Sequence, residues 1–219
     1  MVYTDVHTHF NPARPARADV RRIVSLRFPS ETAVPAGLFS AGVHPWDAAA
    51  VSDADVSDRL ARFVVSQSAV AIGECGIDRL CGVPLERQMK VFAAQTELAE
   101  MLSLPLVIHA VRASADVVLL HRRMKPSSVW IVHGFRGKPR QAEELLAEGI
   151  FLSVGLRFNP ELPKVLGCDR LLVESDTADV PLEAVYGVVA AAWGMERDVL
   201  AACVGRTFDS LFGGGAAIV

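Results

Sequence analysis

Short runs of apolar, mostly β-branched residues recur along the chain and predict eight strands. Several of these runs lack the alternation of apolar and polar positions that marks a strand with one exposed face. This pattern is typical of strands buried on both faces of a parallel sheet. We expect strands at Val2–Val6, Ile23–Phe28, Gly37–Val43, Ala69–Gly73, Pro105–Ile108, Val129–Val132, Ile150–Val154 and Arg170–Val173.

Most of the stretches between these strands carry apolar residues at helical spacing. The clearest pattern runs from Pro84 to Leu102, where the proline suits the first turn of a helix. The other expected helices are Asp55–Ser66, Ser114–Arg123, Pro139–Glu148, Pro160–Leu166, Pro181–Trp193 and Glu196–Phe212. Alternating strands and helices predict an α/β fold with right-handed crossovers.

The number of strands and the chain length together predict a compact TIM-type (β/α)8 barrel. At 219 residues the chain is shorter than the ~250 typical of this fold, so we expect the barrel to be incomplete or distorted. The weak place is Pro29–Ala36, which is too short and too rich in proline for a crossover helix. Nothing marks a domain boundary, so we expect one domain over residues 1–212 and a flexible tail over residues 213–219.

Composition narrows the class of protein. Hydrophobic residues make up 51% of the chain and charged residues 21%, which favours one deep core and excludes a disordered protein. The apolar runs are too short to cross a membrane, and Met1–Phe10 does not resemble a signal peptide, so we expect a cytoplasmic protein. The net charge of −3 gives no overall attraction to nucleic acid or membranes. The four dispersed cysteines are interpreted as free thiols.

Histidines and acids sit at the ends of the predicted strands. In a parallel barrel these carboxyl ends share one rim, where the active sites of this fold lie. Residues at i and i+2 of a strand point the same way, so both histidines of the first strand can face the barrel axis. The residues are His7, His9, Glu74, His109, His133 and Asp176.

Such a cluster predicts a metal site, because buried charges need a partner ion or a metal. Six protein ligands would saturate a single ion and leave little room for water or substrate, so two divalent ions fit better than one. Four imidazoles favour Zn or Mn, with Mg, Ni or Fe as alternatives. Taken singly, a histidine at a strand end is more often an ordinary rim or core residue than a ligand, and Glu74 and Asp176 could as well be helix caps or salt-bridge partners.

The motifs that contain these residues resemble, in sequence and order, those of the TatD family of metal-dependent hydrolases. They are His7-Thr8-His9, Gly42–Pro45, Ala71–Asp78, Leu104–His109, Ile131–Phe135 and Leu172–Asp176, and the resemblance runs from about Val2 to Phe212. It implies a TIM-type barrel and deoxyribonuclease activity. It also implies one metal on His7, His9 and Asp176, a second on His109 and His133, and Glu74 bridging the two. The chain resembles a short branch of the family with Gly-Phe-Arg-Gly-Lys after the sixth strand.

Two features differ from the usual pattern of the family. The segment after Asp176 is shorter, and Arg112 lies three residues after His109 instead of two. As a mechanism we hypothesise that the metal pair activates a water molecule, with Asp176 as general base. Glu74 is the second residue that we expect catalysis to require.

Substrate contacts are predicted at the same rim. Arg136 and Lys138 lie between a strand end and a helix start, where an anion is favoured, although both could equally be solvated loop charges. His44 and Arg112 are further candidates, and Asp78 could orient a metal-bound histidine. Trp46, Phe10 and Phe135 could stack on bases, but we expect them to pack in the core.

The leading prediction is therefore hydrolysis of a phosphodiester in DNA or a nucleotide, with no membrane or obligate protein partner. An amidohydrolase-type cleavage of C–N or ester bonds would use the same site, and an apolar, neutral pocket mouth would favour it. A third alternative is a metal-binding scaffold that does not catalyse. The presence of all six candidate ligands argues against that alternative.

Overall fold

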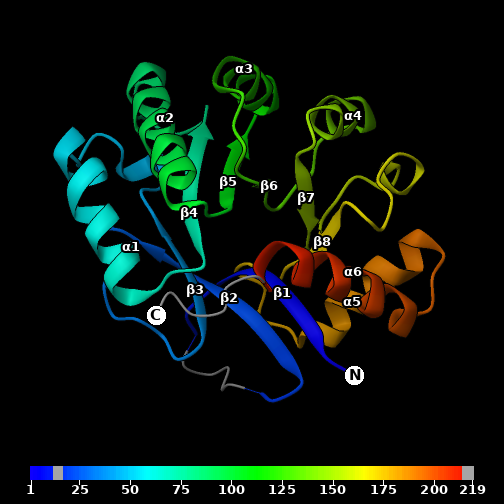
Figure 1. Cartoon of the computed structure of the whole chain (residues 1–219). Helices are drawn as coiled ribbons and strands as arrows, with labels where there is room; N and C mark the ends of the chain where they lie inside the picture. The colour runs from blue at the N-terminus through cyan, green and yellow to red at the C-terminus, as the bar shows by residue number, and fades with distance from the viewer. Residues whose placement is uncertain (12–16, 214–219) are drawn as a thin grey trace.

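The computed structural model describes residues 1–11 and 17–213, and eight parallel strands form its centre (Figure 1). They pair in chain order from first to last, which confirms the predicted α/β architecture. All eight expected strands are present, as β1 (Tyr3–His9), β2 (Val20–Arg27), β3 (Leu38–Gly42), β4 (Ala71–Asp78), β5 (Leu106–Val111), β6 (Trp130–Val132), β7 (Phe151–Val154) and β8 (Leu171–Val173).

Backbone pairing between the first strand and the segment after the last nearly closes the sheet into a barrel. Thr8 forms an isolated parallel bridge with Asp176. The Asp176 N–H donates to the His7 carbonyl at 3.0 Å, and the His9 N–H donates to the Asp176 carbonyl at 3.5 Å. The predicted TIM-type barrel is confirmed. These bonds lie at the carboxyl end of β1, so they join the strand that carries two histidines to the segment that carries an acid.

Helices lie outside the strands (Figure 1). They are α1 (Ala61–Gln67), α2 (Leu85–Leu102), α3 (Ser114–Met124), α4 (Pro139–Ala147), α5 (Leu182–Trp193) and α6 (Arg197–Phe212). A π-helical turn, η2 (Asp55–Leu60), precedes α1, and a 3₁₀ turn, η1 (Pro45–Asp47), follows β3. As expected, no helix joins β2 to β3, which are the strands on either side of Pro29–Ala36.

One predicted helix is wrong. The segment Pro160–Leu166 forms only the 3₁₀ turn η3 (Leu162–Lys164). Pro163 stands inside this segment, and proline removes a backbone donor and clashes with the preceding turn of an α-helix. The apolar spacing of Leu162 and Leu166, which predicted a helix, instead places both side chains in the core.

Two cysteines differ from their interpretation as free thiols. Cys168 and Cys203 form a disulfide with their Cα atoms 6.2 Å apart, while Cys75 and Cys81 are free. Cys168 precedes β8 and Cys203 lies in α6, which packs on β8. The two cysteines are 35 residues apart in the sequence, and nothing in the sequence pattern indicated that they would be close in space.

None of the helices in the described part of the chain is long and apolar enough to span a membrane. Of the tail expected over residues 213–219, all but Gly213 lies outside the described residues.

Candidate metal centre

All six predicted ligands lie together at the carboxyl ends of the strands. His7 and His9 come from β1, Glu74 from β4 and His109 from β5. His133 directly follows β6, and Asp176 follows β8. The strands β4 and β5 continue four and two residues beyond Glu74 and His109 respectively, so these side chains lie within the strands and not at their last positions.

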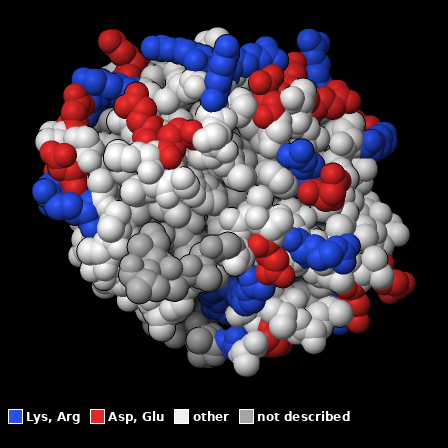
Figure 2. All heavy atoms as spheres, in the orientation of Figure 1, with Lys and Arg blue, Asp and Glu red and all other residues white. Residues whose placement is uncertain are grey.

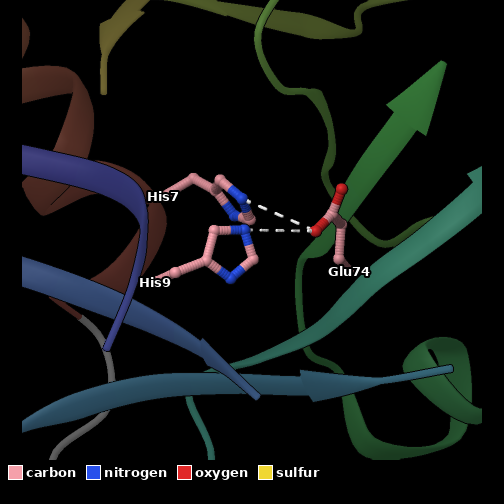
Figure 3. Close-up of side chains that lie close together, drawn as sticks. All are labelled: His7, His9 and Glu74. Atoms are coloured by element: carbon pink, nitrogen blue, oxygen red, sulfur yellow. Dashed lines mark ion pairs between the residues drawn. The ribbon is translucent and has the colours of Figure 1, made fainter. Parts of the chain in front are cut away.

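One group of donors gathers around a single oxygen of Glu74. The Nε2 atoms of His7 and His9 lie 3.7 and 3.8 Å from Glu74 Oε2, and both rings point toward that carboxylate (Figure 3). The same nitrogens lie 3.8 and 3.5 Å from Asp176 Oδ1. Two imidazoles from one strand and two carboxylates from others thus face a common point.

The spacing of these atoms fits a metal ion. An ion with tetrahedral bonds of about 2.0–2.2 Å keeps its ligand atoms about 3.3–3.6 Å apart. The four distances of 3.5–3.8 Å are close to this range and too long for good hydrogen bonds. Both ring nitrogens of His7 are buried without a hydrogen-bond partner. An unpaired nitrogen in this position is what a missing cation would leave.

A second group gathers around the other oxygen of Glu74. His109 Nδ1 lies 2.7 Å from Glu74 Oε1 and His133 Nε2 lies 2.8 Å from it. His44 Nε2 lies 3.3 Å from the same oxygen. The donor atoms of His44, Glu74 and His109 all lie within 4.8 Å of one another, as do those of His7, His9 and Glu74. The sequence predicted His44 as a substrate contact, and its Nδ1 accepts from the Trp46 N–H at 3.2 Å, so its Nε2 carries the N–H that faces Glu74.

Charge within the cluster holds Glu74 ionised. Burial alone would raise the pKa of Glu74, but the charge of His133 and hydrogen bonds from His109, His133 and His44 hold it well below the usual range. Burial alone would lower the pKa of His133, but Glu74 and Glu174 raise it well above the usual range.

The two histidines of β1 differ in their titration. Burial, together with the charge of His133, lowers the pKa of His7 to about 4, so this imidazole is neutral near pH 7 with a lone pair free for a metal. The neighbouring Asp176 carboxylate raises the pKa of His9. Burial opposes ionisation of Asp176, but the neighbouring imidazoles of His9 and His7 leave its pKa below the usual value.

Two glutamines of α2 hold the strand ends that carry the site. The Gln95 side chain accepts from the Val43 N–H at 2.7 Å and donates to the Val43 carbonyl at 3.1 Å, directly before His44. The Gln88 side chain forms the same pair of bonds with the backbone of Asp78, at 2.8 and 3.1 Å. Buried polar residues on a helix thus fix the backbone at the ends of β3 and β4.

A close approach of β4 and β5 pairs Gly76, two residues after Glu74, with His109. Gly76 has a φ of +132°, and a Cβ atom at this position would overlap the carbonyl oxygen of His109. Only glycine fits here without moving one of the strands.

Two buried acids near the site were not predicted as functional. Asp5 accepts from the N–H and hydroxyl of Ser175 at 2.9 and 2.6 Å, and this hydroxyl also lies 2.9 Å from the Thr8 hydroxyl. The network fixes the residue before Asp176, whose φ is +49°. Glu174 accepts from the Ser153 hydroxyl, and its Oε1 lies 3.5 Å from His133 Nδ1. The sequence offered one indication of both residues, because each is an acid within or next to an apolar strand.

The predicted orienting residue Asp78 lies near the site but bonds elsewhere. Its Oδ2 atom is 3.6 Å from His109 Nε2, beyond hydrogen-bond distance, and accepts from Trp46 Nε1 at 2.7 Å. Its Oδ1 atom accepts from the Leu80 N–H at 2.8 Å. Asp78 thus caps a turn and also faces His109.

The predicted substrate contacts do not lie together in the way that the six predicted ligands do. Arg136 lines a pocket of about 340 Å³ that also includes Asp176. Lys138 is exposed at the start of α4 and is not part of that pocket lining. Arg112 is exposed directly after β5 and takes no part in the ion pairs of the cluster among the described residues.

The three aromatic residues do not share one environment. Phe135 is buried, as expected, but Trp46 and Phe10 are 53% and 68% exposed, so the expectation of core packing is wrong for them. Trp46 follows Pro45 in η1, whose short turn holds the indole at the rim.

Comparison with known proteins gives the family. The model of the family described as TatD related DNase matches residues 4–213. The chain belongs to this family. The match includes all six residues of the cluster, and it confirms the resemblance seen in the motifs.

Curated relatives of this TatD-family chain include proteins named 3′-5′ ssDNA/RNA exonuclease TatD. That of Pectobacterium atrosepticum is 34% identical over 149 residues, and that of Cronobacter turicensis is 36% identical over 154 residues. The matches cover 63% and 64% of the chain. They span only 56% and 57% of the relatives.

Solved structures share the fold. A TatD homologue from Escherichia coli superposes with a TM-score of 0.83 at 23% identity, covering 96% of this chain and 98% of the other. A TatD-family hydrolase from Entamoeba histolytica gives 0.79 at 13% identity, with coverage of 96% and 98%. An uncharacterised amidohydrolase from Saccharomyces cerevisiae gives 0.77 at 18% identity, with coverage of 96% and 99%.

Proposed function

We propose that this protein is a metal-dependent phosphodiesterase that degrades single-stranded DNA or RNA. The observation that carries the proposal is the position of Glu74, whose two oxygens each face a separate group of histidines. A carboxylate shared in this way suits a pair of cations, the arrangement that stabilises both the attacking and the leaving oxygen of a phosphate ester.

The residues suggest which side chains would hold each ion. His7, His9 and Asp176 would bind the first, His109 and His133 the second, and Glu74 both. His44 lies beside the second group, but its Nδ1 accepts from the Trp46 N–H, so its Nε2 carries the N–H and can donate to Glu74 or to a substrate phosphate. The four imidazoles favour Zn or Mn over Mg, which prefers oxygen ligands.

When bound, such ions supply a water molecule of lowered pKa and polarise the phosphate. The residues of the chain then have three tasks. Asp176 is ionised and partly exposed at the rim, so it can accept the proton of the attacking water. Asp5 and Ser175 hold Asp176 in place. Arg136, with Lys138, Arg112 and His44 as further candidates, would contact substrate phosphates.

The support for a phosphate substrate comes from individual basic side chains near the site and not from the net charge of the protein, which is −3. In the view of Figure 2, Lys and Arg side chains lie together along the upper edge, both signs are mixed on the right of the face, and a broad area at the centre is uncharged. An arginine beside Asp176 is therefore a more useful guide to the substrate. The names of the curated relatives agree with a single-stranded nucleic acid.

The test is one panel of substrates offered to the metal-loaded protein. It contains bis(4-nitrophenyl) phosphate, single- and double-stranded DNA, single-stranded RNA and simple amides. We expect turnover of the first compound and of the single strands, and none of the amides. The control variant is Arg123→Gln, which changes an exposed arginine in the last turn of α3, at the end of the barrel opposite the site, and should leave the pattern unchanged. Turnover of amides alone would replace the proposal with amidohydrolase chemistry, and no turnover at all would favour a non-catalytic scaffold.

A further inference from the structure

The pocket beside Asp176 has two arginines on its wall, of which the sequence predicted only one. Arg136 comes from the loop after β6, and Arg157 comes from the loop after β7. Asp176, after β8, completes the same lining. Three consecutive loops at the carboxyl end of the barrel thus converge on a space of about 340 Å³. This volume is at the lower end of the ~300–1,000 Å³ found for small-molecule sites.

The inner wall of this pocket is closely built. Glu174 is buried there and accepts a hydrogen bond from the Ser153 hydroxyl. Gly134 and Gly155 flank it, and a Cβ atom would lie 3.1 Å from Glu174 Oε1 at the first position and 3.3 Å from the Glu174 carbonyl at the second. Both contacts are tighter than usual, so side chains are poorly accommodated here. The two glycines leave the pocket open.

The acids that line the pocket are paired with other groups, so Arg136 and Arg157 can bind an anion. The acids of the inner wall already face histidines, since Glu174 lies 3.5 Å from His133 and Asp176 lies 3.5 Å from His9. Asp179, also on the wall, has a partner of its own. Arg136 and Arg157 have no ion pair or hydrogen bond within residues 1–11 and 17–213. Two guanidinium groups on one pocket favour a phosphate, which can accept paired hydrogen bonds from each.

We propose that this pocket binds a second phosphate of the substrate, adjacent in the strand to the phosphate that is hydrolysed. The inference rests on the proposed function and narrows it. On this proposal the protein prefers nucleotides and nucleic-acid strands that carry two neighbouring phosphates. Arg157 is one of the residues that determine this preference. A diester with a single phosphate would occupy the metal centre and leave the pocket unused.

Binding tests the pocket directly. Thymidine 3′,5′-bisphosphate and thymidine 5′-monophosphate are titrated into the full-length, metal-loaded protein by calorimetry. We expect the bisphosphate to bind at least about tenfold more tightly, because one lost charge-assisted hydrogen bond has about this effect. Arg157→Gln should remove most of that difference, and Arg123→Gln, in the last turn of α3, should keep it. Equal affinity for the two ligands, or a full difference in Arg157→Gln, would overturn the proposal.

Turnover separates this inference from the proposed function. A thymidine dinucleotide with a phosphate at its 5′ or its 3′ end is compared with the same dinucleotide without it, and with bis(4-nitrophenyl) phosphate. We expect a higher kcat/KM for at least one phosphorylated form, and we expect Arg157→Gln to lower its ratio to bis(4-nitrophenyl) phosphate about tenfold. Equal values for all dinucleotides, with bis(4-nitrophenyl) phosphate turned over, would refute the pocket and leave the phosphodiesterase intact. If no substrate is turned over, the phosphodiesterase fails and the calorimetry alone decides the pocket.

Discussion

At the scale of single residues, the site depends on a few buried groups whose charges have no partner except one another. Glu74 lies between two sets of imidazoles, and His7 has two buried nitrogens without a hydrogen bond. Residue type and position predicted these side chains, because histidines and acids stand out at the ends of apolar strands. The supporting acids Asp5, inside β1, and Glu174, directly after β8, were missed, since the sequence does not tell which residue such an acid will contact.

Removing the proposed base should stop turnover without unfolding the protein. For Asp176→Asn we expect kcat on bis(4-nitrophenyl) phosphate to fall by at least about 100-fold, the usual lower effect of losing a general base. The backbone of Asp176, which bonds to β1, is unchanged by this substitution. Steady-state kinetics and circular dichroism give the two readouts. Near-normal kcat in a folded variant would rule out Asp176 as the base.

Removing the hydroxyl of Ser175, the residue before Asp176, should lower the stability of the fold. Ser175→Ala removes the hydroxyl that donates to Asp5 at 2.6 Å and leaves that buried carboxylate with one fewer bond. We expect a cost of about 1–3 kcal/mol in the free energy of unfolding, measured in urea. Restoring the hydroxyl with Ser175→Thr should recover part of it. A variant as stable as the parent would show that the network does not hold this segment.

At the scale of elements, the strands followed the prediction more closely than the helices did. Eight apolar runs became eight strands because strands buried on both faces have a direct apolar signature. The strand ends were misjudged at Glu74 and His109, where a polar residue was taken as the end of a strand although its side chain faces the barrel axis. The helix expected at Pro160–Leu166 failed at Pro163. The disulfide and the glutamine bonds from α2 depend on tertiary contacts that local patterns do not contain.

A carboxylate on α2 links this helix to the segment before β6 and should give a pH-dependent stability. Burial opposes ionisation of Glu100, but hydrogen bonds from Ser127 and Ser128 lower its pKa to about 2. An acid with a lowered pKa stabilises the fold fully above its unfolded pKa, and this contribution disappears as the pH falls toward the folded value. We therefore expect Glu100→Gln to cost about 1 kcal/mol at pH 7.

The difference between the parent and Glu100→Gln should shrink between about pH 4.5 and pH 2. Urea unfolding at pH 7 and pH 3 measures it. Glu97→Gln, which changes an exposed acid on the same helix, is the matched control and should show no such trend. A difference that stays constant or grows at pH 3 would contradict the assigned role of Glu100.

The contact between α5 and β1 supports the strand that carries His7 and His9. The buried Tyr186 hydroxyl donates to the Thr4 carbonyl at 2.8 Å and accepts from the Thr4 N–H at 3.3 Å. Tyr186→Phe would leave both backbone groups without this partner. We expect the free energy of unfolding in urea to fall by about 1–3 kcal/mol. An unchanged value would mean that the hydroxyl does not contribute to joining α5 to the barrel.

At the scale of the whole molecule, the barrel brings together side chains that are far apart in the sequence. His7 and Asp176 lie far apart in the sequence, and the bridge between β1 and the segment after β8 makes them neighbours. This joining was predictable once a closed barrel was predicted, because all strands of such a barrel end at one rim. The second arginine of the pocket was not predictable, since Arg157 lies in a loop with no motif of its own.

Metal binding should stabilise the whole molecule, because the ligands from β1, β4, β5 and the segments after β6 and β8 are brought together only in the folded chain. An ion that binds only the folded state at about 100 times its Kd adds about 2.7 kcal/mol to the free energy of unfolding. We expect Zn or Mn to raise the Tm of the parent, a chelator to reverse the rise, and Glu74→Gln to reduce it strongly. Equal rises in the parent and in Glu74→Gln would place the bound metal elsewhere.

The most direct measurement of the central claim is anomalous diffraction from crystals of the Zn- or Mn-loaded protein. We predict two peaks on either side of the Glu74 carboxylate, one bonded to His7, His9 and Asp176 and the other to His109 and His133. Bonds of about 2.0–2.2 Å are expected for Zn. Crystals with fully loaded protein and no peak beside Glu74 would contradict the claim, and a single peak would refute the paired site.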